Sequence, residues 1–218
     1  MDSYLIQTGK RWVLYAEDLP LPEGEAGRSQ NPVDRIIRSL AARGAWWATG
    51  MSRLIGTVRD GYYELQNRLD PMERVFKRMR HAGPMRVHFS SSLTESEARA
   101  RLKSLLVSQR NRHAAWMIFD GLLALGTLPL APFLVPIPGP NLFFYYPALR
   151  TFSHWLAWQG VLAGLRHMPP QLLAREEIAS LEHVIGRKGI PDSRAEIQDL
   201  ASRLELEQLP EFIARYQS

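Results

Sequence analysis

The chain has 218 residues, 45% of them hydrophobic and 22% charged, which is enough for a sizeable core and excludes global disorder. An excess of Lys and Arg (27) over Asp and Glu (22) gives a net charge of +5, which permits an anionic partner without requiring one. The absence of cysteine excludes disulfides, a thiol nucleophile and thiolate metal sites. Residues 1–30 contain neither a signal-peptide segment nor a transit-peptide pattern, so we expect no cleaved targeting sequence there.

The N-terminal third predicts a small β-hairpin followed by helices. Two β-prone runs in SYLIQTGKRWVLYAED, residues 3–18, flank a Thr-Gly-Lys turn, which is typical of a hairpin. An isolated hairpin is marginally stable in water, so we expect it to pack on helices. Apolar spacing predicts helices over 33–55 and 57–68. A third helix follows, with Asp70 as its N-cap and Pro71 at its first position.

The middle and the end of the chain add one short strand and further helices. A run at 85–89 breaks the helical period and predicts a strand that joins the hairpin. Thr94 and Glu97 form a capping-box pattern at the start of a basic helix that continues into an apolar region. The tail predicts two or three short amphipathic helices, one of which starts at a second capping box, Ser193 with Glu196.

The apolar region is the most unusual part of the chain. Between residues 114 and 164 the only Asp, Glu, Lys or Arg residues are Asp120 and Arg150. A helix over 114–128 reaches about 22 Å and a second helix over 142–165 about 36 Å, against a bilayer core of about 30 Å. A proline inside the second helix means that this helix either kinks or becomes regular there. The sequence predicts a helical membrane hairpin, and the alternative is the buried centre of a soluble helical protein.

Basic residues around this hairpin predict its orientation and its lipid contacts. They precede the first apolar helix and follow the second, while the connection between the helices has none. By the positive-inside rule, both chain ends lie on the cytoplasmic or matrix side. The basic stretch before the hairpin favours anionic lipid headgroups, and we expect no nucleic-acid partner. The lipid-binding candidates are Arg99, Arg101, Lys103, Arg110 and Arg112.

The predicted fold is mainly α with a small N-terminal β element, in which soluble amphipathic helices flank a helical membrane hairpin. Residues 1–112 contain the β-hairpin with basic and aromatic helices, 113–167 the apolar helical hairpin, and 168–218 an amphipathic helical tail. The proline-rich turn predicts a rigid connection whose asparagine caps the second helix, with an ion-coordinating broken helix as the alternative. The turn residues are Pro136, Pro138, Pro140 and Asn141.

Three residues of the hairpin are candidates for an ion or proton path. Asp120 is ionisable within an apolar segment, where such a group faces a partner or water. Depth along the helices, about 12 Å for Asp120, 18 Å for His154 and 24 Å for Arg150, pairs Asp120 with His154 more easily than with Arg150. A carboxylate and an imidazole could exchange a proton near neutral pH. In the alternative, Asp120 is interfacial and His154 is a packing residue. Arg150, near the far end of the second helix, is expected to reach the interface or a lipid phosphate rather than to pair with Asp120.

Several segments of the sequence together resemble one family. YLIQTGKRWVLY, AARGAWWATG, YELQNRLDPMERVFKRM, LVPIPGPNLFFYYPALRTFSHWLAWQGVLAGLRH and LPEFIARY are similar to segments of the mitochondrial K+/H+ exchange-related proteins, small membrane proteins linked to potassium–proton exchange. The most specific part is the proline-asparagine turn followed by Tyr145, Arg150 and Ser153. The resemblance implies a role in monovalent cation homeostasis, as exchanger component or accessory factor. It implies a bacterial inner membrane, or the mitochondrial inner membrane in a eukaryote, and the composition favours a bacterial homologue.

Other classes of protein have less support. The histidines lack partners at metal-ligand spacing, so we expect neither a metal centre nor a cofactor. Motifs of hydrolases, nucleotide-binding enzymes and zinc proteases are absent, so we expect no enzyme. Two helices cannot enclose an ion path, so an exchanger would need a homo-oligomer or another membrane protein. The alternatives are a membrane-anchored scaffold or assembly protein and a soluble helical interaction protein.

Overall fold

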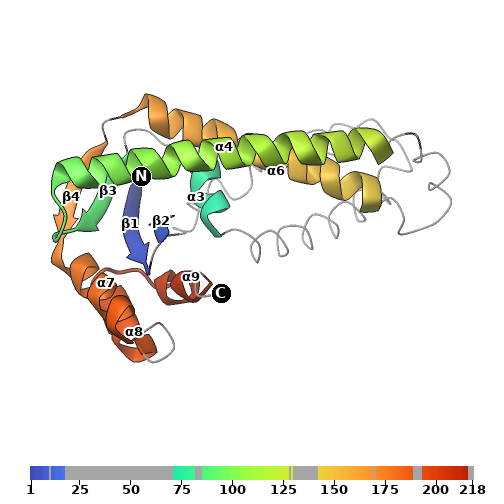
Figure 1. The fold of residues 1–218 in the computed structure, drawn as a ribbon. Helices are drawn as coiled ribbons and strands as arrows, with labels where there is room; N and C mark the ends of the chain where they lie inside the picture. Colours follow the sequence, from blue (N-terminus) through green and yellow to red (C-terminus); the bar gives the residue numbers. More distant parts are fainter. Residues whose placement is uncertain are drawn as a thin grey trace, which may run out of the picture. The chain divides into compact units, whose positions relative to one another are not determined.

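The computed structural model describes the larger part of the chain (Figure 1). Residue contacts divide the chain into two units: Met1–Glu17 with Asp70–Ser218, and Asp18–Leu69. All described residues belong to the first unit. They are 1–9, 11–17, 71–81, 85–127, 129, 142–168, 170–188 and 193–215.

Several predicted features lie outside the described residues. They are the helices over 33–55 and 57–68, the N-cap Asp70, and the turn with Pro136, Pro138, Pro140 and Asn141. These features stay predictions. The hairpin arms on either side of the turn and the N-terminal strands are described, so the remaining predictions can be compared with the structure.

Four strands form one mixed sheet. β1 (Asp2–Thr8) and β2 (Arg11–Tyr15) are antiparallel, and the turn between them contains Gly9 with φ +61°. Glycine adopts this left-handed conformation without the steric cost of a Cβ. β3 (Arg86–Ser90) is parallel to β1, and β4 (Gln171–Arg175) is parallel to β3, which gives the order β2-β1-β3-β4.

The predicted hairpin and the strand predicted at 85–89 are therefore confirmed, but the predicted sheet is too small. The sequence signal missed β4, whose residues do not alternate between buried and exposed sites. Pairing with β3, a strand far away in the sequence, determines its extended conformation instead. The C-terminal region is thus not helical throughout, because its first element completes the sheet.

Helices surround this sheet and make the described unit mainly α-helical. α4 and α6 run side by side as a long hairpin, α3 packs against α6 and β2, and α7 packs against β1 and β3 (Figure 1). Apolar side chains of strands and helices share one core, in which Phe76, Leu102, Leu106, Ile178 and Leu181 are fully buried. The helices are α3 (Pro71–Met79), α4 (Glu95–Thr127), α6 (Leu142–Arg166), α7 (Glu176–Lys188), α8 (Arg194–Arg203) and α9 (Leu209–Ala214).

One predicted helix cap is confirmed and another is wrong. The Glu97 N–H donates to Thr94 Oγ1 (3.3 Å), and the Thr94 N–H donates to Glu97 Oε2 (2.9 Å), so the first capping box forms as predicted. Ser193 makes no side-chain cap hydrogen bond. Its buried hydroxyl donates instead to the Val184 carbonyl of α7 (3.4 Å). This tertiary hydrogen bond takes the place of the helix cap that the local sequence pattern predicted.

α3 and α6 approach each other closely at two glycines. A Cβ on Gly160 would lie 1.6 Å from the carbonyl oxygen of Phe76, and a Cβ on Gly164 would lie 2.2 Å from Met79 Cε. The obstruction at Gly160 is backbone, which cannot rotate away as a side chain can. Glycine therefore allows α3 to lie directly against the α6 backbone and fixes the position of the α3 side chains relative to the hairpin.

The predicted helical hairpin is present, but the described helices do not support a membrane-spanning one. α6 begins at Leu142 and continues through Pro147, so its regular part does not begin at the proline. None of the described helices combines the length and the apolar content that crossing a membrane requires. The apolar half of α4 begins only after His113, and α6 contains the ionisable Arg150 and His154.

Candidate proton-binding site

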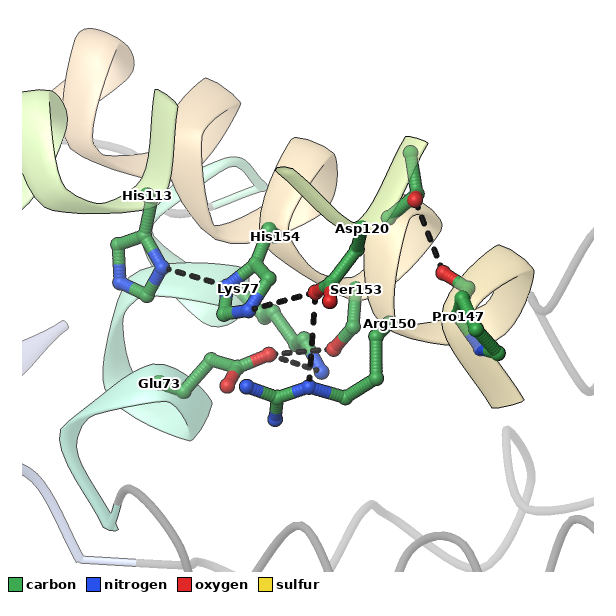
Figure 2. Close-up of polar contacts among 9 residues, drawn as sticks. Glu73, Lys77, His113, Asp120, Pro147, Arg150, Ser153 and His154 are labelled. Atoms are coloured by element: carbon green, nitrogen blue, oxygen red, sulfur yellow. Dashed lines mark hydrogen bonds and ion pairs between the residues drawn. The ribbon is translucent and has the colours of Figure 1, made fainter. Parts of the chain in front are cut away.

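Polar and ionisable side chains of three helices meet inside the helical hairpin (Figure 2). α3 contributes from its first two turns, α4 from its middle, and α6 from the turns that follow Pro147. We call this group the ionisable cluster. It consists of Glu73, Lys77, His113, Asp120, Arg150 and His154, together with Ser153.

Asp120 lies between two cationic or basic partners on α6. Its Oδ2 atom is 3.6 Å from His154 Nε2 and 3.9 Å from Arg150 Nε, and the residue is 7% exposed. Burial raises the pKa of the Asp120 carboxyl, although the Arg150 guanidinium opposes the rise. Neither contact is as short as a direct hydrogen bond, so the carboxylate is held by charge without being tightly locked to one partner.

The structure thus brings Asp120 together with His154, and the expectation that Arg150 reaches the interface rather than pairing with Asp120 is wrong. The depth estimate behind that expectation assumed that Arg112 on α4 and Arg166 on α6 lie at the same level. In the structure, Gly121 faces Thr151, since a Cβ on Gly121 would lie 3.7 Å from Thr151 Cγ2. This helix register aligns Asp120 with the turn of α6 that runs from Arg150 to His154.

Two buried histidines extend the cluster away from Asp120. His113 Nδ1 and His154 Nδ1 are 3.0 Å apart, and the two residues are only 1% and 3% exposed. The His113 ring also meets the edge of Phe76 at a centroid distance of 5.8 Å. Burial lowers the pKa of each imidazole to about 4, although Glu73 favours the charged form of both. Both histidines are therefore neutral near pH 7.

α3 adds an ion pair on the other side of the cluster. Lys77 Nζ is 3.1 Å from Glu73 Oε1, and the Ser153 hydroxyl donates a hydrogen bond to the same oxygen. Burial alone would raise the pKa of Glu73, but Lys77 and the Ser153 hydrogen bond together lower it. Burial lowers the pKa of Lys77, against the attraction of Glu73. The sequence signal for this pair is its i,i+4 spacing, which alone does not reveal contact with α6.

The cluster is electrically balanced near neutral pH. Two carboxylates, Glu73 and Asp120, face two cations, Lys77 and Arg150, while the two histidines are neutral. Such a group has proton acceptors but no surplus negative charge for a resident potassium ion. The described residues also contain no group of three or more His, Cys, Asp or Glu that could hold a metal ion. The chemistry that the arrangement allows is the binding and transfer of protons.

α4 changes its polarity near His113. Before this residue, its buried side is mainly apolar, with Ala98, Leu102, Leu105 and Leu106, and its exposed side is charged. From His113 onward its buried residues are ionisable and its exposed side is apolar, the reverse of an ordinary amphipathic helix in water. With two α6 residues this side forms what we call the apolar outer face: Trp116, Ile118, Phe119, Leu122, Leu123, Leu125, Tyr146 and Trp155, which are 37% to 66% exposed.

The predicted lipid-binding residues lie on the first half of α4, where all except the half-buried Arg110 are exposed. Several of these residues already have partners in the protein, and the Arg110 guanidinium donates hydrogen bonds to Asn111 Oδ1 (3.1 and 3.2 Å). Arg99 pairs with Glu95 (2.6 Å), and the Arg101 guanidinium lies over the Trp12 ring at 5.9 Å. The role of Arg99, Arg101, Lys103, Arg110 and Arg112 in lipid binding stays a prediction.

Sequence reasoning missed three members of the ionisable cluster. His113 lies seven residues before Asp120, which is two helical turns, so both project from the same side of α4. That spacing was the available signal for His113. No comparable signal existed for Glu73 and Lys77, because their contact with the hairpin depends on the packing of α3 at Gly160.

Comparison with known proteins agrees with the resemblance seen in the sequence. A family model described as mitochondrial K+-H+ exchange-related matches residues 5–167. The matched region contains every residue of the ionisable cluster. No match was found among the curated proteins or among the solved structures.

Proposed function

Because the chain belongs to the mitochondrial K+-H+ exchange-related family, we propose that it takes part in the exchange of potassium ions for protons across a membrane. In this proposal the ionisable cluster binds and releases the proton. The observation that carries it is the buried approach of Asp120 Oδ2 to His154 Nε2, 3.6 Å apart between α4 and α6. Both groups exist in a charged and a neutral form, and a small approach of the two helices or one bridging water brings them within reach for proton transfer.

The proposal assigns the cation path to a larger assembly. At rest, Lys77 and Arg150 neutralise the two carboxylates, so the cluster offers potassium no vacant negative charge. A helical pair is also too small to surround an ion path by itself. The protein acts as one component of an exchanger, either as a homo-oligomer or with another membrane protein, or as an accessory factor that responds to protons.

The membrane part of the proposal is supported by the polarity change along α4. A water-facing basic half next to a lipid-facing apolar half fits a helix that passes from the headgroups into the hydrocarbon layer. We therefore assign the apolar outer face to lipid, the basic half of α4 to anionic headgroups, and both chain ends to one side of a mitochondrial or bacterial inner membrane.

Purified protein in potassium-loaded vesicles tests this function. We expect potassium-dependent proton flux with the wild type, and its loss in Asp120→Asn, because asparagine keeps the shape of the side chain but cannot titrate. Asp199→Asn is the matched control, since Asp199 is an exposed carboxylate paired with Arg203 (2.6 Å) on α8. That variant should retain the wild-type flux.

Two results would contradict the proposal in different ways. Equal flux in Asp120→Asn and the wild type, with both proteins folded by circular dichroism, removes the cluster as the proton site. Absence of flux from the wild type, together with disturbed potassium handling in cells that lack the protein, leaves only the accessory or scaffold role.

A further inference from the structure

We propose that His113, His154 and Asp120 form a directional proton relay whose entry atom is His113 Nε2 and whose terminal acceptor is Asp120 Oδ2. The inference rests on the proposed function, because it names the route of the proton within the same cluster. The evidence for it is that the nitrogen and oxygen atoms of the three side chains face one another in sequence, from His113 through His154 to Asp120 (Figure 2).

The position of Asp120 determines the tautomer of both histidines. Asp120 Oδ2 lies 3.6 Å from His154 Nε2, which is beyond a direct hydrogen bond, and its negative charge favours an N–H over a lone pair on the nitrogen that faces it. A neutral imidazole has one N–H, which leaves His154 Nδ1 as an acceptor. The 3.0 Å contact then requires that His113 donates from Nδ1. The remaining nitrogen, His113 Nε2, must therefore have a free lone pair.

The free lone pair of His113 is buried. His113 is 1% exposed, and its Nε2 has no hydrogen-bond partner among the residues that the structure describes, as is also true of His154 Nε2 and Asp120 Oδ2, which face each other at 3.6 Å. A buried acceptor without a partner is costly, and in native proteins such an atom calls for a specific explanation. A role as the proton entry point explains it, because the lone pair is then kept free for an incoming proton.

The relay moves one proton from His113 Nε2 to Asp120 Oδ2, and the charge of both histidines is the same at the end as at the start. A proton binds to His113 Nε2, and His113 releases its Nδ1 proton to His154 Nδ1. His154 then releases its Nε2 proton to Asp120 Oδ2, which becomes a neutral carboxylic acid. Only N–H and O–H bonds form and break, and both histidines end in the opposite neutral tautomer. The last transfer spans 3.6 Å, so it needs a small approach of α4 and α6 or one bridging water.

Charges from all three helices surround the relay. Glu73 on α3 favours a proton on either histidine, whereas Lys77 on α3, Arg112 on α4 and, for His154, Arg150 on α6 disfavour it. Burial disfavours the charged imidazole most strongly. A proton therefore does not stay on the histidines near pH 7, and burial raises the pKa of the Asp120 carboxyl, which makes it the acceptor at the end of the relay.

Nitrogen-15 NMR of the whole protein tests the predicted tautomers directly. At pH 7.5 we expect His113 to carry its proton on Nδ1 and His154 on Nε2. His88 is an internal reference for the Nε2–H tautomer that we expect of His154, because its Nε2 faces Asp2 Oδ1 (3.2 Å) and its Nδ1 accepts from Arg175 Nε (3.3 Å). With six histidines in the chain, each can be assigned by single substitution. A proton on Nε2 of His113, or on Nδ1 of His154, would overturn the relay.

A matched pair of variants tests the entry atom. His113→Asn keeps a donor at the Nδ1 position and removes Nε2, whereas His183→Asn makes the same change at an exposed residue of α7. We expect His113→Asn to retain the Nε2–H tautomer of His154 and to lose about tenfold or more of the proton flux, and His183→Asn to lose none. Unchanged flux in His113→Asn overturns the relay. A wild type without flux contradicts exchange by this protein itself instead, while the tautomers still decide the relay.

Discussion

His113 and His154 illustrate how burial changes the chemistry of a single residue. In water an imidazole is half protonated near pH 6.5, but both of these side chains are almost fully enclosed, and the pKa of each falls to about 4. The folded protein therefore prefers the neutral rings, whereas the unfolded chain binds protons at a higher pH. The difference couples the stability of the hairpin to pH.

We expect the free energy of unfolding to decrease as the pH falls from 6.5 toward 4. A lowered folded-state pKa means that the unfolded state binds more protons in this range, so the stability is fully present above 6.5 and is lost on acidification. The loss at pH 5 is about 2 kcal/mol for each histidine. Urea unfolding between pH 7.5 and 5 measures it, and His113→Asn should remove about half of the loss. A stability that is constant over this range would contradict the burial of neutral histidines.

At this scale the sequence predicted Asp120, His154 and Arg150 as candidates, because ionisable residues are rare between 114 and 164. It did not predict their relative positions, since counting residues along two helices assumes a register that Gly121 and Thr151 determine by contact. Whether these three residues carry protons stays a prediction of the sequence and of the structure alike.

At the scale of elements, the contact of α3 with α6 positions two of the six ionisable residues of the cluster, Glu73 and Lys77. Gly160 lies against the backbone of α3 at Phe76, one turn after Glu73 and next to Lys77. A displacement of α3 would move both side chains away from Ser153 and the histidines. The absence of a side chain at residue 160 is therefore a requirement of the site as well as of the packing.

We expect Gly160→Ala to destabilise the protein by at least about 2 kcal/mol, because the added methyl overlaps a backbone oxygen and forces the helices apart. Gly126→Ala is the matched control, since a Cβ there meets nothing within 4 Å and alanine favours a helix interior. That variant should be as stable as the wild type or slightly more stable. Chemical unfolding of both variants measures the difference, and equal stabilities would show that α3 adjusts without cost.

Features that depend on neighbouring residues could be predicted from the sequence, whereas features that depend on contacts with other elements could not. The turn at Gly9 and the capping box at Thr94 depend on neighbouring residues, and both were predicted. β4 depends on pairing with β3, and the hydroxyl of Ser193 bonds to Val184, a residue of the preceding helix. Patterns of a few residues do not contain this information.

At the scale of the whole molecule, the described unit has two kinds of surface. The first half of α4 exposes charge, while its second half exposes the apolar outer face and encloses ionisable groups. From His113 to Thr127 this second half extends about 21 Å, which is shorter than a bilayer core of about 30 Å. In the proposed membrane role, this part of the hairpin enters the lipid from one side.

We expect the protein to bind vesicles of phosphatidylcholine with phosphatidylglycerol. The double variant Leu122→Ser with Leu125→Ser should weaken binding about tenfold, because both leucines are about two-thirds exposed and contribute apolar surface without packing inside. Arg99→Gln with Lys103→Gln should weaken only binding to the anionic lipid. Co-sedimentation measures both. Leucine variants that bind like the wild type but no longer self-associate would assign the face to a second copy of the chain.

The parallel pairing of β3 with β4 has a consequence for how the chain assembles. One long connection, residues 91–170, joins the adjacent strands β3 and β4 and contains the whole α4–α6 hairpin. The two ends of this connection lie one strand spacing apart, about 4.8 Å. Packing of the two antiparallel helices against each other therefore brings β4 to the edge of β3. We therefore expect the sheet to be completed only after the hairpin has closed. Amide protection of Gln171–Arg175 then measures, at the sheet, whether the hairpin has closed.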